Sequence, residues 1–186
     1  MNDCDGAFIR HPDLQRLFRY WLGLSIDGQV PLRRDIDPLA VRDLMPNLQL
    51  LDVGATPDDL RYRLVGGEIA AAFGFEPRGK TRREIREAYV SPDKYDDFDQ
   101  TSRETHDVAR RGVVAYTHDY MTSYDHDFLA YARLLLPLSE EGLAITGIFG
   151  ALMMSSSTRG FWHGFQPLQV EVPITKFGLR AAITLA

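Results

Sequence analysis

Three consecutive apolar segments constrain the fold of this chain more than any other feature. They span residues 113–122, 127–137 and 143–154, and only the short segments TSYDHD and SEEG separate them. Turns of this length join neighbouring antiparallel strands. The second and third segments are apolar at nearly every position, which is typical of strands covered on both faces. The sequence therefore predicts an antiparallel meander with a layer of chain on each side.

An amphipathic helix near the N-terminus can supply one of those layers. Pro12 suits the first turn of a helix and Gly23 suits its end, which predicts a helix over about residues 12–23. Its apolar residues recur at helical spacing along one side, and they are Leu14, Leu17, Phe18, Trp21 and Leu22. We expect this stripe to cover the sheet, and it is also the candidate interface with a second chain.

The chain before the meander adds two strands and several helices. Residues 48–53 and 60–65 predict an antiparallel pair joined by the turn-forming segment GATPDD. A short helix over about residues 38–45 should end before Pro46, because proline disfavours helix in the residue that precedes it. The remaining signals are a brief helix at 68–73, an irregular or weakly helical stretch at 75–89 and a long helix from Ser91 to about Arg111.

Together these elements predict an α+β fold. It has one five-stranded antiparallel sheet, with helices on one face and the N-terminal amphipathic helix on the other. The expected domain covers residues 48–153, between an N-terminal extension of residues 1–47 and a C-terminal extension of residues 154–186. Neither extension is long enough for a kinase, a cyclase or a DNA-binding domain, so we expect a protein without a catalytic output of its own.

Composition excludes several classes of protein. The 186 residues carry a net charge of −5, and 45% of them are hydrophobic, which is typical of a folded globular chain. The single cysteine, Cys4, cannot form an internal disulfide or a four-cysteine zinc site. The chain has no basic surplus, no signal peptide and no apolar run of about 18 residues. We therefore expect a cytoplasmic protein that binds neither nucleic acid nor membrane.

The segment from Gly74 to Thr81 matches the pattern of a phosphate-binding loop, G-x-x-x-x-G-K-[ST]. That loop requires a buried strand before its first glycine, whereas the preceding residues EIAAAF favour a helix. Glu76 would place a carboxylate where phosphate should lie, and Pro77 lacks an amide donor. Nucleotide binding at this segment is therefore a weak third alternative.

The sequence contains few arrangements that indicate catalysis or metal binding. It has no G-x-S-x-G motif and no H-E-x-x-H spacing, so we assign no catalytic residue and no metal ligand. One face of residues 113–122 carries Val114, Tyr116, His118 and Tyr120, which could border a small-molecule pocket or form ordinary aromatic packing. The second alternative is accordingly a small α+β enzyme or ligand carrier in which Tyr116 and His118 perform acid–base chemistry.

The order of elements resembles that of the PAS domain family. The resemblance covers roughly residues 30–153, with the helix at 12–23 in the place of a helix that commonly precedes the domain. It is closest to bacterial stand-alone PAS proteins, and the segments that carry it are PLRRDIDPLAVRDLMPNLQLLDV, RYRLVGGEIAAAFGFEPRGKTRREI and LLLPLSEEG.

The resemblance implies a sensor or interaction domain in bacterial signalling. PAS domains bind small ligands between their central helices and their sheet, and they dimerise through flanking helices. By this analogy the candidate pocket residues are Phe98, Tyr116, His118 and Arg133. The analogy further implies a homodimer through the N-terminal helix, a separate protein effector and a possible small-molecule ligand.

The resemblance also bears on cofactors. Flavin photoreceptors of the family need a cysteine in the helical middle, and this chain has none there, so we do not expect flavin–cysteine photochemistry. Haem-binding members use a histidine on the long helix, for which only His106 is available, and no supporting pattern surrounds it. Haem is therefore not expected, and the identity of any cofactor is unknown.

Overall fold

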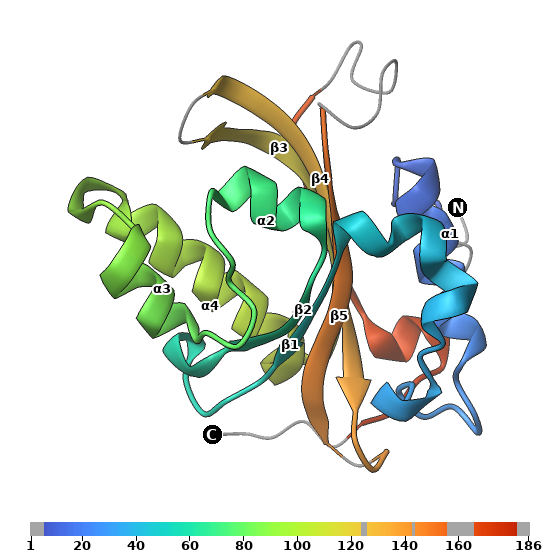
Figure 1. Ribbon diagram of the computed structural model, residues 1–186. Helices are drawn as coiled ribbons and strands as arrows, with labels where there is room; N and C mark the ends of the chain where they lie inside the picture. The colour runs from blue at the N-terminus through green and yellow to red at the C-terminus, as the bar shows by residue number, and fades with distance from the viewer. Residues whose placement is uncertain (1–5, 124–125, 143, 156–165, 182–186) are drawn as a thin grey trace.

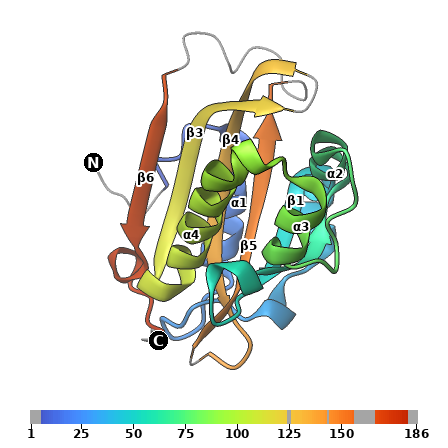
Figure 2. The same ribbon diagram turned by 90° about the vertical axis from the view of Figure 1, so that its left-hand side faces the viewer.

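The computed structural model describes residues 6–123, 126–142, 144–155 and 166–181. They form a six-stranded, fully antiparallel sheet in the order β2-β1-β5-β4-β3-β6 (Figure 1, Figure 2). The strands are β1 (Leu48–Asp52), β2 (Arg61–Val65), β3 (Val113–Ser123), β4 (His126–Ser139), β5 (Ile145–Met154) and β6 (Leu168–Pro173). The predicted pair and the predicted meander are both present, which confirms the α+β class.

Strand β6 is an addition to the five expected strands. It comes from the C-terminal extension and pairs with β3 from Val113–Pro173 to His118–Leu168. Because it is an edge strand with most of its residues half-buried or exposed, its sequence has no strong apolar pattern. This explains why residues 168–173 give only a weak signal.

Helices cover both faces of the sheet (Figure 1, Figure 2). One face carries α2 (Gly67–Phe73), α3 (Arg82–Tyr89) and α4 (Tyr95–Arg111), and the other carries α1 (Pro12–Gly23). The 3-10 helices are η2 (Arg33–Asp35), η3 (Pro38–Asn47), η4 (Pro57–Asp59), η5 (Pro92–Lys94) and η6 (Ile174–Phe177). Two layers explain why β4 and β5 are apolar at nearly every position, since nearly all the side chains of these strands that the structure describes are at least partly covered.

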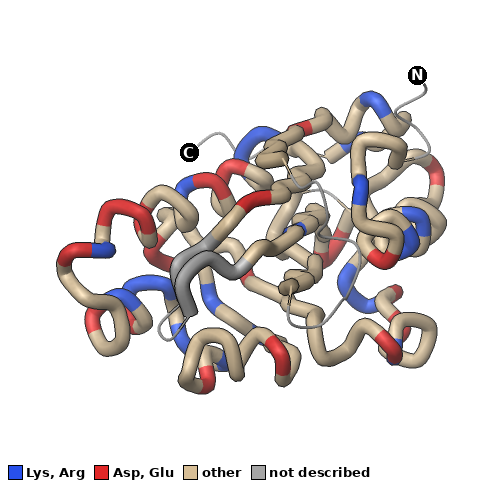
Figure 3. Tube along the Cα trace, turned by 90° about the horizontal axis from the view of Figure 1, so that it is seen from above, with Lys and Arg blue, Asp and Glu red and all other residues tan. Residues whose placement is uncertain are grey.

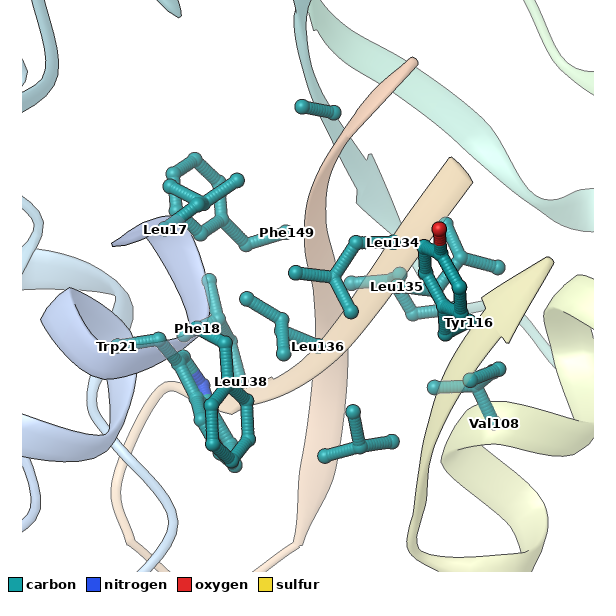
Figure 4. Close-up of a cluster of buried hydrophobic side chains, with 14 of the residues drawn as sticks. Leu17, Phe18, Trp21, Val108, Tyr116, Leu134, Leu135, Leu136, Leu138 and Phe149 are labelled. Carbon is teal, nitrogen blue, oxygen red and sulfur yellow. The ribbon is translucent and has the colours of Figure 1, made fainter. Parts of the chain in front are cut away.

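Helix α1 packs on the sheet through its apolar stripe (Figure 4). Leu14, Leu17, Phe18 and Trp21 are each 0% exposed, and Leu22 is half-buried. The indole Nε1 of Trp21 donates a hydrogen bond to the Pro137 carbonyl oxygen of β4 at 2.9 Å. The predicted cover is therefore confirmed.

The same burial corrects the candidate interface. Four of the five stripe side chains have no free surface left for a second chain, because the sheet of their own chain covers them. Any contact with a second copy through α1 must use the opposite side of this helix.

Two local predictions were wrong. The helix expected to end before Pro46 is the kinked 3-10 helix η3, which continues through Pro46 to Asn47. The stretch 75–89, expected to be irregular or weakly helical, contains the regular helix α3. The Thr81 hydroxyl accepts a hydrogen bond from the Glu84 amide, and the Glu84 carboxylate accepts one from the Thr81 amide. This reciprocal capping box starts α3, and the sequence T-R-R-E already carries its signature.

The surface carries charges of both signs. Figure 3 shows acidic and basic residues interspersed around the helices of the described chain. None of the described helices is long and apolar enough to cross a bilayer. Cys4, on which the exclusion of disulfides rests, lies outside the described residues.

Candidate functional site

The register of the sheet divides the four candidate pocket residues between its two faces. Arg133 of β4 lies directly opposite Thr117 of β3 and Leu152 of β5, so these three side chains share a face. Tyr116 and His118 flank Thr117 along β3 and therefore point to the other face. The Arg133 face is the one beneath the central helices, because its guanidinium pairs with Glu104 of α4 at 3.5 Å.

Phe98 and Arg133 therefore lie between the central helices and the sheet. Phe98 belongs to α4 and is half-buried. The Arg133 side chain is only 15% exposed. Both residues occupy the layer that the resemblance indicated, on opposite walls of it.

Tyr116 and His118 lie on the α1 face instead. The Tyr116 hydroxyl accepts a hydrogen bond from the His11 amide at 3.3 Å, and the side chain is 0% exposed. Burial raises the pKa of the Tyr116 phenol. Burial, together with Arg10 and His11, lowers the pKa of His118 to about 4. These two residues therefore do not belong to a site beneath the central helices. Alternation along a strand could not predict their position, because it does not say which layer of helices covers which face of the sheet.

Arg82 was missed by the sequence analysis. This residue follows the cap of α3, yet it is only 8% exposed and reaches under α4. Its guanidinium stacks on the Phe98 ring at 3.8 Å and donates to the Tyr62 hydroxyl at 3.1 Å. It also donates to Ser102 Oγ at 2.8 Å, to Thr101 Oγ1 at 2.6 Å and to the Phe98 carbonyl at 3.1 Å. No local pattern separates Arg82 from its exposed neighbour Arg83.

These contacts connect α3, β2 and α4, which leads to a prediction. Arg82→Met removes four hydrogen bonds and leaves their buried acceptors without this donor, so we expect a loss of about 2–3 kcal/mol in the free energy of unfolding. Urea denaturation measures this loss. The control Arg83→Met, whose ion pairs are longer than 3.6 Å and half-exposed, should change stability by less than about 0.5 kcal/mol. Equal effects of the two substitutions would contradict the role of Arg82.

The segment from Gly74 to Thr81 is not a phosphate-binding loop. A helix, α2, precedes it, and Gly74 closes that helix with φ of 72°. Its amides already have acceptors in the chain: Arg78 donates to the Glu76 carboxylate, Gly79 to the Tyr62 carbonyl and Lys80 to the Pro77 carbonyl. A phosphate cradle needs these amides free, so the structure contradicts the nucleotide-binding alternative.

His106 is the histidine that the family resemblance leaves available on the long helix for haem. It lies on α4, and its Nε2 is 3.1 Å from the Gly54 carbonyl oxygen in the connection between β1 and β2. Within the part of the chain that the structure describes, no three His, Cys, Asp or Glu side chains gather as a metal-ligand group.

The face of the sheet beneath the central helices mixes polar and apolar side chains. Thr117 is 7% exposed and Gln49, on the same face of β1, is 6% exposed. Tyr131 lies two residues from Arg133 on β4, and burial raises the pKa of its phenol. Apolar side chains from β5 and α2 flank this group, and they are Leu152, Met154, Ile69 and Phe73. A small number of polar groups among apolar side chains is typical of binding sites for small molecules.

Comparison with models of known protein families assigns the chain to one of them. A model of the PAS domain matches residues 9–153, a span that includes α1. The chain therefore belongs to the PAS domain family, a family of sensor domains. No curated protein sequence matches it.

Solved structures with a similar fold include VqmA bound to DPO, with 12% identity and a TM-score of 0.46 over 62% of this chain and 54% of VqmA. A second is an RNA-binding Light-Oxygen-Voltage receptor, with 14% identity and a TM-score of 0.43 over 70% of this chain and 36% of the receptor. A third is the LOV protein of Rhodobacter sphaeroides, with 12% identity and a TM-score of 0.41 over 64% and 68% of the two chains. The chain thus spans about half of VqmA.

Proposed function

We propose that this chain is a sensor domain that binds a small ligand between its central helices and its sheet, and that it signals by contact with a separate protein. The observation that carries the proposal is the group of polar side chains in this buried layer, Thr117, Tyr131 and Arg133. Burying a guanidinium costs free energy unless it is fully paired. A layer that serves only for packing would not need this charge, whereas a binding site uses it to orient a ligand.

The proposal includes no catalytic residue. The acid–base pair suggested by the sequence, Tyr116 and His118, is 0% and 3% exposed on the α1 face. A substrate could reach these groups only if the N-terminal segment, held by the bond from His11 to Tyr116, moved away. The burial of Tyr116 and His118 therefore argues against acid–base catalysis at these residues.

Contact with a second copy through the N-terminal helix is part of the same proposal. Since the stripe is buried, this contact would use the outer side of α1 and the turn after it. In that turn, Ile26 is 69% exposed. Exposed apolar side chains of this kind favour association, because contact removes them from water.

Native mass spectrometry of freshly purified protein tests the ligand and the dimer together. We expect a dimer whose mass exceeds that of two bare chains by a retained small molecule. Ile26→Asp should yield a monomer that keeps the ligand, and Arg133→Met should yield a dimer without it. A wild-type spectrum that contains only the bare monomer would contradict both parts of the proposal.

A further inference from the structure

Arg133 is less completely paired than the other arginine in the same layer. Arg82 makes four hydrogen bonds of 2.6–3.1 Å and stacks on an aromatic ring. Within the part of the chain that the structure describes, Arg133 makes one hydrogen bond, from Nη2 to the Glu104 carboxylate at 3.5 Å, which is long for a charge-assisted hydrogen bond. Among the described residues, its buried Nε has no hydrogen-bond partner. The guanidinium therefore keeps donors for a further acceptor.

The surroundings of Arg133 define the chemistry of that acceptor. A guanidinium presents its N–H groups as a planar fork that matches a carboxylate. Thr117 lies opposite Arg133 and Tyr131 lies two residues away on the same strand, so both hydroxyl-bearing side chains share the sheet face of Arg133. Leu152 borders it on β5, next to Ile69 of α2. A molecule that fits this arrangement has an anionic end and an apolar body.

Glu104 already brings a carboxylate to Arg133, but it is held loosely. Its other oxygen accepts a hydrogen bond from the Gln100 side chain at 3.0 Å on the same helix, and its own side chain is 27% exposed. Such a group can turn toward water without leaving a buried charge behind. Its contact with Arg133 connects α4 to β4, and a competing carboxylate would break that connection.

We propose that the ligand of this site carries a carboxylate, which binds the Arg133 guanidinium in place of Glu104 and thereby breaks the ion pair between α4 and the sheet. This inference rests on the proposed function, because it specifies the ligand of the same site. The exchange also links ligand binding to the surface of the protein, because α4 belongs to the outer layer of helices that covers one face of the sheet (Figure 2).

Titrations with matched probes test the proposal. The probes are benzoate and hexanoate, each compared with its neutral amide, benzamide or hexanamide. Binding is followed by the backbone amide signals of Thr117, Leu152 and the middle of α4 in nuclear magnetic resonance spectra. We expect the two acids to bind at least about tenfold more tightly than the amides, because only the acids form charge-assisted hydrogen bonds.

Three substitutions make the test specific. Arg133→Met should weaken binding of the acids at least about tenfold, to the level of the amides. Glu104→Gln should tighten it several-fold, since the competing charge is gone. The control Arg110→Met removes an exposed arginine from α4 and should leave binding unchanged. Thermal melting curves of each variant, recorded without any probe, show whether the variant is folded.

The outcomes separate this inference from the proposed function. If acids and amides bind equally, or if Arg133→Met binds the acids as well as the wild type does, the carboxylate inference is wrong while the ligand site stands. If neither kind of probe shifts these signals, the inference is also wrong. A small molecule retained in the native mass spectrum would then still support the proposed function.

Discussion

Trp21→Ala is expected to lower the free energy of unfolding by about 3–5 kcal/mol, the usual cost of truncating a fully buried tryptophan. Trp21 is 0% exposed, and it lies beside Phe18 with ring centroids 5.9 Å apart. Its removal would leave a void between α1 and β4, and the Pro137 carbonyl oxygen would lose its hydrogen-bond donor. Urea denaturation followed by circular dichroism measures the loss.

Two further variants separate the causes of that loss. Trp21→Phe keeps most of the apolar volume but cannot donate to Pro137, so it should cost about 1 kcal/mol beyond the small change in packing. Arg19→Ala, on the exposed side of the same helix, should stay within about 0.5 kcal/mol of the wild type. If Trp21→Ala halved the solution mass of the protein while its stability stayed the same, Trp21 would belong to an interface and not to the cover of the sheet.

Acid should destabilise the protein through His118. This side chain is 3% exposed, and burial, with Arg10 and His11 nearby, lowers its pKa from 6.5 to about 4. Between these two values the unfolded chain binds a proton that the folded chain does not, so stability falls as pH falls. This lowering of the His118 pKa corresponds to a loss of up to about 3 kcal/mol in the free energy of unfolding, complete once the pH is below about 4.

The difference between the wild type and His118→Asn isolates this contribution. Carboxylates and His11, whose pKa burial also lowers, add their own acid dependence, but they do so in both proteins. Urea denaturation at several pH values should show a wild-type advantage that shrinks by up to about 3 kcal/mol from pH 7 to pH 4. A constant difference between the two proteins over this range would show that His118 does not remain neutral in the folded state.

Much of the fold could be predicted because it depends on periodicity within short segments. The strand signals at 113–122 and 143–154 and the stripe of α1 are local, and the structure has all of them. Helix α3 is regular where the sequence predicts an irregular or weakly helical stretch, because Pro77 and Gly79 are helix breakers, although Thr81 and Glu84 carry a capping-box signature. The segment of strand β6 gives only a weak strand or helix signal for another reason, since an edge strand needs little apolar sequence.

The candidate site could be predicted only in part. The family resemblance led to the layer between helices and sheet, and two of the four residues named for it, Phe98 and Arg133, lie there. Tyr116 lies on the opposite face, where its hydroxyl contacts the His11 amide. The sequence could not show this, because alternation along β3 defines two sets of side chains but does not say which helix lies above each set. Arg82 carries no local mark of burial, because burial of an arginine depends on acceptors from distant segments.

By itself, the sequence determined the strand pair, the strand meander, the amphipathic cover of the sheet and the membership of the PAS family. These features depend on hydrophobic periodicity, turn composition and the order of motifs, which can be read along the sequence without knowing which segments contact each other in the fold. Only the tertiary structure decided which strand face meets which helix, and which arginine is fully paired. The pairing of β3 with β4 and the approach of α4 set these features, because they bring together residues that lie far apart in the chain.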